Sequence, residues 1–91
     1  MEHWPREGDA EAMPRVPKVP KSREPSESRK TFAASVRRER HAQGLTLEDL
    51  GERSNLEWSY LSQVERGIRN ITVDNMDAIA RGLGLPLRDL L

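Results

Sequence analysis

The stretch that decides the fold is TLEDLGERSNLEWSYLSQVERG, residues 46–67. In its first turn Thr46 is followed three positions later by Asp49, the hydroxyl-and-acid pattern of a capping box at a helix N-terminus. Only residues 54–56 separate this helix from the next helical spacing, and Asn55 is a residue type that tolerates a positive φ. Two helices joined by so short a turn cross at a steep angle. The stretch therefore predicts a helix-turn-helix.

Apolar residues recur at helical spacing on both sides of this stretch, and no window alternates as a strand does. We predict an all-α domain of five helices. They cover Lys30 to Gln43 (closed by Gly44), a helix from the Thr46 cap, Glu57 to Arg66 (closed by Gly67), Thr72 to Gly82 or Leu83, and a short helix after Pro86.

The first 29 residues differ sharply in composition from the rest. They hold five of the six prolines, many charges and few large apolar side chains, so they cannot bury enough surface to offset the entropy of ordering. We predict a disordered tail over 1–29 and a folded domain over 30–91. The tail is interpreted as a solvated extension, with a proline-motif ligand or a phosphate-binding basic arm as functional alternatives.

Composition excludes several classes of protein. The chain of 91 residues has no cysteine, and His3 and His41 are far apart, so we expect solvated imidazoles and no metal site. The sequence has no cluster of histidines and no glycine-rich phosphate loop. We therefore predict neither an enzyme nor a cofactor site. No apolar run reaches the roughly 20 residues of a membrane span and no secretory signal opens the chain. A cytoplasmic protein is predicted.

The outward side of the predicted helix Glu57–Arg66 is small and polar, unlike the charged surface of a merely solvated helix. Gln63 can donate and accept at the N6/N7 edge of adenine, and Ser59 can bond several base edges. Trp58 offers an apolar face to a thymine methyl or an indole N–H to a phosphate. Net charge opposes this interpretation mildly, because residues 31–91 carry eight basic and nine acidic side chains.

Residues Gly44–Leu50 (GLTLEDL) and Tyr60–Gly67 (YLSQVERG), with an arginine-rich first helix and a closing LGLPLRDLL, resemble the Xre/Cro/lambda-repressor family of helix-turn-helix proteins. The likeness extends over residues 32–91. The chain also looks like the controller proteins of restriction–modification systems at Ser54-Asn55-Leu56, at Tyr60, Ser62 and Glu65, and at Arg69-Asn70-Ile71-Thr72.

The resemblance assigns roles to individual residues. Arg40 and Glu65 match a partly buried ion pair between the first and third helices; two independent solvated side chains are the alternative. Positions matching those that face base edges are Trp58, Ser59, Tyr60 and Gln63. Positions matching those that contact phosphates and set the register are Thr46, Ser62, Arg66, Arg69 and Asn70.

Three residues depart from the family pattern. Leu47 stands where many members have a glutamine that contacts the DNA backbone, and Glu39 stands where an apolar residue is usual. Gly51 replaces the usual alanine where the second and third helices approach closely, at up to ~1 kcal/mol of helix propensity.

These observations predict a transcriptional regulator that binds double-stranded DNA. Because one recognition helix buries little surface, we expect a homodimer on a palindromic operator. The last two helices are the candidate interface, and Leu87, Leu90 and Leu91 are either its anchors or, for Leu87 and Leu90, monomer core. A protein-interaction adaptor or coactivator built on the same fold is the alternative, and would show little DNA affinity at any salt concentration.

Overall fold

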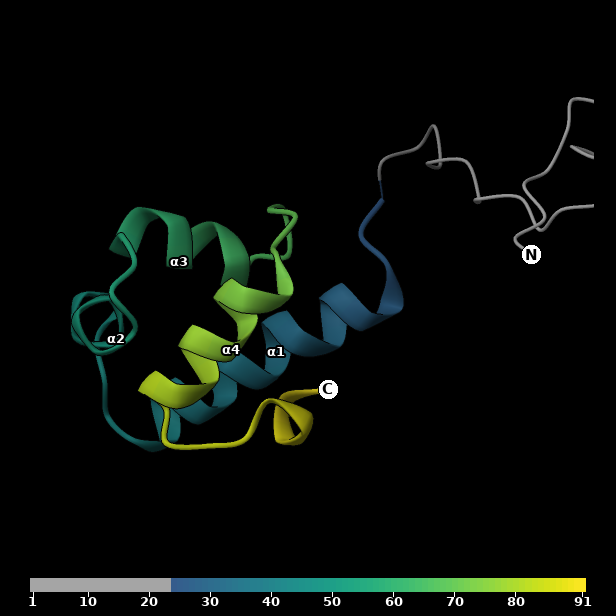
Figure 1. Cartoon of the computed structure of the whole chain (residues 1–91). Helices are drawn as coiled ribbons and strands as arrows, with labels where there is room; N and C mark the ends of the chain where they lie inside the picture. Colours follow the sequence, from purple (N-terminus) through teal and green to yellow (C-terminus); the bar gives the residue numbers. More distant parts are fainter. Residues whose placement is uncertain (1–23) are drawn as a thin grey trace, which may run out of the picture.

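The computed structural model describes residues 24–91. Four α-helices and one 3-10 helix follow one another: α1 (Glu27–Ala42), α2 (Leu47–Ser54), α3 (Trp58–Glu65), α4 (Val73–Gly82) and η2 (Leu87–Leu90). Figure 1 shows α3 above the crossing of α1 and α4, with α2 seen nearly end-on beside them. The all-α domain is as predicted. The prediction of five helices is wrong for the last one, which is a 3-10 helix.

That last element is a single 3-10 turn, in which Asp89 N–H bonds the carbonyl of Pro86 at 3.0 Å. Pro86 cannot donate a hydrogen bond from its own nitrogen. Only four residues lie between Pro86 and Leu91, and so short a segment readily adopts the tighter i to i+3 pattern of a 3-10 helix.

Helix α1 begins earlier than the predicted Lys30. Ser26 takes the N-cap position, where its hydroxyl accepts from the Arg29 N–H at 3.1 Å, and Glu27 occupies the favourable first turn. Helical structure therefore extends into the last residues assigned to the tail. The predicted disorder of residues 1–23 lies outside the described residues.

Aliphatic side chains from every element, with Phe32, make one core. Its buried members are Phe32, Val36, Leu50, Leu61, Val64, Ile79, Ala80, Leu83 and Leu90. Full burial of a Leu or Ile side chain contributes about 1.5–3 kcal/mol, so this cluster holds the short helices in place. Leu90 is fully buried in it and belongs to the monomer core, whereas Leu91 is exposed.

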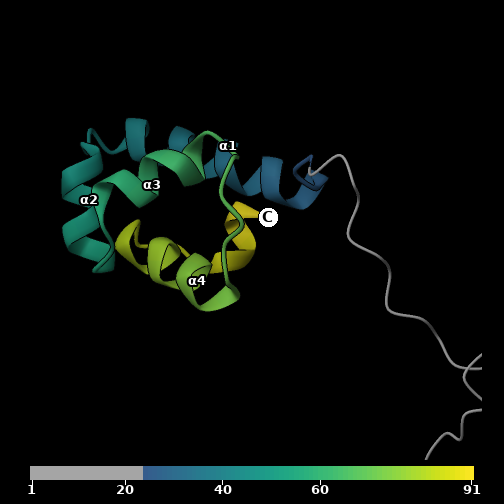
Figure 2. The same cartoon turned by 90° about the horizontal axis from the view of Figure 1, so that it is seen from above.

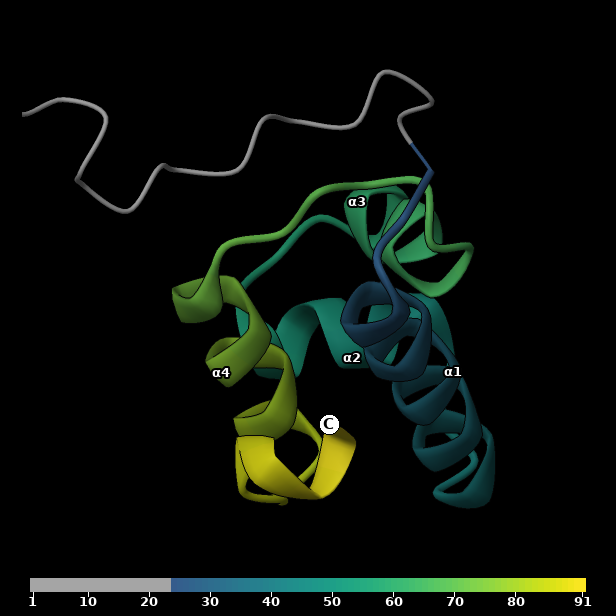
Figure 3. The same cartoon turned by 90° about the vertical axis from the view of Figure 1, so that its right-hand side faces the viewer.

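Helix α2 packs against α3 and α4, while η2 closes the gap between α4 and α1. Figure 3 shows η2 at the end of the domain opposite α3. Gln43, at the end of α1, donates from Nε2 to the Leu83 carbonyl at 2.7 Å, which ties the ends of α1 and α4 together. Among residues 24–91, no helix has both the length and the apolar character that a membrane span requires.

Candidate nucleic-acid interface

The turn between α2 and α3 fixes how α3 projects from the domain. Asn55 adopts the left-handed conformation (φ 59°) and ends α2, and the Leu56 N–H bonds the Gly51 carbonyl at 3.0 Å. A Cβ atom at Gly51 would lie 2.7 Å from the Leu56 carbonyl oxygen. A side chain there would force the turn to shift, which explains the glycine that departs from the family's usual alanine.

Helix α3 buries Leu61 and Val64 and turns its polar side outward. Trp58 is 53% exposed and Ser59 is exposed, while Gln63 is partly buried one turn later. Within residues 24–91 the side chains of Ser59 and Gln63 make no hydrogen bond, so their donors and acceptors are available to a ligand. Their spacing of four residues places them side by side on one face. The Glu57 side chain, at the N-cap, makes no capping bond.

Tyr60 differs from its neighbours because it is partly buried and already engaged. Its hydroxyl oxygen accepts from Asn75 Nδ2 at 3.1 Å, and the guanidinium of Arg69 lies 5.1 Å from its ring centroid. The ring also packs against the hydrophobic core. Tyr60 therefore connects α3 to α4 and to the loop between them, with an attraction between cation and ring face.

The loop of residues 66–72 carries the next group of candidate residues. Figure 2 shows it running from the end of α3 to the start of α4. Gly67 (φ 73°) turns the chain out of α3, and Thr72 caps α4 by accepting from the Asn75 N–H at 3.1 Å. Between them Arg69 and Asn70 are exposed, while Ile71 packs against the core. The loop is thus anchored at both ends, with its polar residues outward.

Thr46 forms the predicted capping box with Asp49. The Thr46 hydroxyl accepts from the Asp49 N–H, and the Asp49 carboxylate accepts from the Thr46 N–H, both at 3.0 Å. This bond from the Thr46 backbone is the main cause that lowers the pKa of Asp49. The Thr46 N–H is consequently occupied, whereas its exposed hydroxyl can still donate.

Arg40 and Glu65 form a bidentate pair between α1 and the end of α3. Arg40 Nε lies 2.5 Å from one carboxylate oxygen and Nη2 2.9 Å from the other. The side chains are only 12% and 6% exposed. Arg40 also donates to the Leu45 carbonyl at 2.8 Å. The bond to Glu65 raises the pKa of Arg40 above its usual value. This pair fixes the C-terminal end of α3 on α1.

Sequence reasoning missed Asn75 and the cations on α1. Asn75 follows the Thr72 cap by three positions, a place that suggests only a capping partner, so no local signal revealed its bond to Tyr60. Lys30, Arg37 and Arg38 were visible as an arginine-rich helix, but the side they share with Arg66 depends on how α1 crosses α3.

Residues 24–91 contain no group of three or more His, Cys, Asp or Glu side chains that could hold a metal ion.

Comparison with known proteins gives the chain its family. The helix-turn-helix family matches residues 36–90. The control protein C.BamHI of Bacillus amyloliquefaciens is 36% identical over 61 residues, which are 66% of this chain and 75% of that protein.

Two solved structures are similar over most of the described domain. The restriction–modification controller protein C.AhdI from Aeromonas hydrophila has a TM-score of 0.68 at 35% identity, covering 72% of this chain and 100% of that one. The controller protein C.Esp1396I, solved as a tetramer with its natural 35-base-pair operator, has a TM-score of 0.67 at 31% identity, covering 71% of this chain and 86% of that one.

The resemblance in sequence and the arrangement of α2 and α3 thus agree with these matches. The chain belongs to the Xre-type helix-turn-helix family of non-enzymatic, DNA-binding transcriptional regulators, and its homologues include restriction–modification controller proteins.

Proposed function

We propose that the protein inserts α3 into the major groove of an operator and reads it as one half of a homodimer. The observation that carries this proposal is the free polar face of α3. Ser59 and Gln63 leave their hydrogen-bonding groups unused on a helix that is held by the core and by the Arg40–Glu65 pair. Unpaired donors and acceptors on a helix that is itself held in place suit direct contact with base edges.

The residues around α3 would hold the DNA backbone. The Thr46 hydroxyl lies at the start of α2, Ser62 and Arg66 lie on α3 and at its end, and Arg69 and Asn70 lie on the anchored loop. In this arrangement Trp58 and Ser59 enter the groove first. Tyr60 contributes chiefly by holding Arg69 against its ring, and its contact with a base or sugar stays a prediction.

The surface around η2 would form the dimer interface. Leu91 is 56% exposed there, and Leu87 is partly buried. A homodimer paired through this surface must present both copies of α3 on one side, toward half-sites about one DNA turn apart. The relative C.Esp1396I is itself multimeric, a tetramer on its operator, which supports assembly on DNA. Such a regulator would act in the compartment that holds the DNA.

Selection of bound sequences from a random DNA pool, using the full chain, tests this proposal. We expect enrichment of a palindrome whose half-sites lie one helical turn apart. Enrichment of a single, unpaired half-site would reject the homodimer. Failure to enrich any sequence would reject sequence-specific recognition.

An adaptor function is the second candidate, and the α2 surface favours it. Exposed carboxylates of Glu48, Asp49, Glu52 and Glu57 lie on and just after α2, and such a surface repels phosphates. The two functions differ in their response to salt. Logarithmic DNA affinity falls linearly with logarithmic salt concentration in proportion to the phosphate contacts, whereas an adaptor would bind DNA weakly at every salt concentration.

A further inference from the structure

A groove with a volume of about 540 Å³ lies between α1 and the end of α3. Three cationic side chains of α1 line it with His41, whose Nε2 lies 3.1 Å from Arg40 Nη2, together with the Arg66 side chain and Gly67 beyond the end of α3. The α1 residues are Lys30, Arg37, Arg38 and His41. Ala33 and Ala34 also line it, and their small side chains leave the space between the longer ones open. We call this feature the α1 groove.

Helical geometry aligns three of these side chains. At 100° per residue, Lys30, Arg37 and His41 fall within roughly 40° of one another around α1, and at 1.5 Å per residue they extend over about 16 Å. A row of this length spans several nucleotides, because one DNA strand carries a phosphate about every 3.4 Å of helix axis.

The carboxylates nearest the α1 groove neutralise only part of its positive charge. Glu65 lines the groove but is 6% exposed and bonded to Arg40. Glu39 lies 3.6 Å from Arg38, and the 91%-exposed Glu27 lies 3.5 Å from Lys30. Within residues 24–91 neither Arg37 nor Arg66 forms a salt bridge. The groove therefore keeps a local excess of positive charge, although the chain has none.

The α1 groove continues the polar face of α3. Ser59 and Arg66 are seven residues apart, so their positions around α3 differ by only about 20°. Arg66 thus belongs both to the line of side chains that begins at Ser59 and to the lining of the groove. A DNA duplex seated on that line would reach the groove at its Arg66 end.

We propose that the α1 groove binds backbone phosphates of the same DNA that α3 reads, with Arg37 as its main ligand. This inference rests on the proposed function and extends the contact surface from α3 and its loop onto α1. Two exposed guanidinium groups without carboxylate partners, Arg37 and Arg66, flank a space open to solvent. One guanidinium group can donate two parallel hydrogen bonds to the oxygens of one phosphate. Such contacts add affinity that is independent of base sequence.

The test measures DNA affinity of the full chain as a function of salt, on a duplex of random sequence and on the sequence selected from the random pool. Arg37→Gln should weaken binding to both duplexes by the same factor and reduce the salt slope by about 0.9, the value for one lost phosphate contact. Arg37→Lys should restore most of the slope. The matched control is Arg81→Gln, which removes the same charge from an exposed pair with Asp77 on α4.

Three results would overturn the proposal. Equal salt slopes for Arg37→Gln and Arg81→Gln would show that the groove touches no phosphate, while binding by the wild-type chain would leave the proposed function intact. Unchanged DNA binding by Arg37→Gln, together with lost binding of a polyglutamate peptide, would make the groove a protein-docking site. A wild-type chain that binds neither duplex would reject the proposed function itself, and the inference with it.

Discussion

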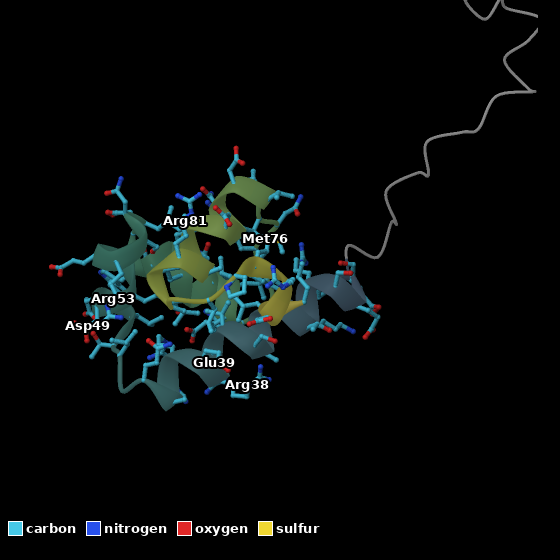
Figure 4. All side chains as sticks on the ribbon, turned by 60° about the horizontal axis from the view of Figure 1, so that its bottom comes forward. Arg38, Glu39, Asp49, Arg53, Met76 and Arg81 are labelled. Atoms are coloured by element: carbon cyan, nitrogen blue, oxygen red, sulfur yellow. The ribbon has the colours of Figure 1, made fainter. Side chains whose placement is uncertain are left out.

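The surfaces on the two sides of α3 carry opposite charge. On one side lies the α1 groove with Lys30, Arg37 and Arg66; on the other lies α2, where several exposed carboxylates accompany a single arginine. Those α2-side residues are Glu48, Asp49, Glu52, Glu57 and Arg53. Figure 4 shows Asp49 beside Arg53 on α2, and Arg38 beside Glu39 on α1. The chain's net charge of zero therefore conceals two unlike surfaces within the described domain. A DNA-binding protein needs cations where the phosphates run, and placement decides this more than the total.

The positive charge of the α1 groove depends first on Arg40, which neutralises the Glu65 carboxylate that lines the groove. Glu65→Ala leaves a mostly buried guanidinium without its partner, and we expect a loss of about 3 kcal/mol in the free energy of unfolding. Chemical denaturation measures it. The control is Glu27→Ala, which breaks an exposed pair and should cost less than about 1 kcal/mol. Equal losses of unfolding free energy for Glu65→Ala and Glu27→Ala would show that the Arg40–Glu65 pair stabilises the fold no more than an exposed pair does.

Tyr60 joins the polar face of α3 to α4 and to Arg69. Tyr60→Phe keeps the ring under Arg69 and removes the oxygen that accepts from Asn75, so we expect a loss of about 1 kcal/mol in the free energy of unfolding. Thermal or chemical denaturation measures this loss, and Asn75→Ala should give a similar value. Because the ring remains, the salt slope of DNA binding should not change. A reduced slope in Tyr60→Phe would mean that the hydroxyl itself contacts the DNA backbone.

The smallest expected effect concerns Asp49 on the α2 side. Its pKa is lowered in the folded state by bonds with Thr46. A carboxyl whose folded pKa lies below its unfolded value stabilises the fold above the unfolded pKa, about 3.9 for aspartate. That stabilisation disappears as pH falls through the folded pKa. The difference in unfolding free energy between wild type and Asp49→Asn should therefore shrink on acidification. A difference that stays constant with pH would indicate a role for Asp49 other than its charge.

Much of the fold follows from local patterns. The Thr46–Asp49 capping box, the positive φ of Asn55 and the caps at Gly67 and Thr72 depend on neighbouring residues, so sequence spacing was sufficient to place them. The start of α1 and the 3-10 form of η2 were missed, since Ser26 lies in a proline- and charge-rich stretch and a single turn has too few residues to show a period.

The candidate site was predictable in its residue types but not in its connections. The exposed face of α3 follows from its 3.6-residue repeat, which buries Leu61 and Val64 and turns Ser59 outward. By contrast, the bond between Tyr60 and Asn75 and the alignment of Arg37 with Arg66 depend on helix crossings. The spacing of residues along one helix does not determine how that helix crosses another.

In the proposed complex α3 reads bases, while the residues after it hold the DNA backbone. The direct measurement compares Gln63→Ala with Arg69→Ala on the selected operator, on copies with each base pair changed, and on random DNA. Gln63→Ala should cost about 1–3 kcal/mol on the operator and relax preference at one position of each half-site. Arg69→Ala should weaken binding to all duplexes alike and lower the salt slope by about one. The account is contradicted if Gln63→Ala weakens all sequences equally while Arg69→Ala changes the base preference.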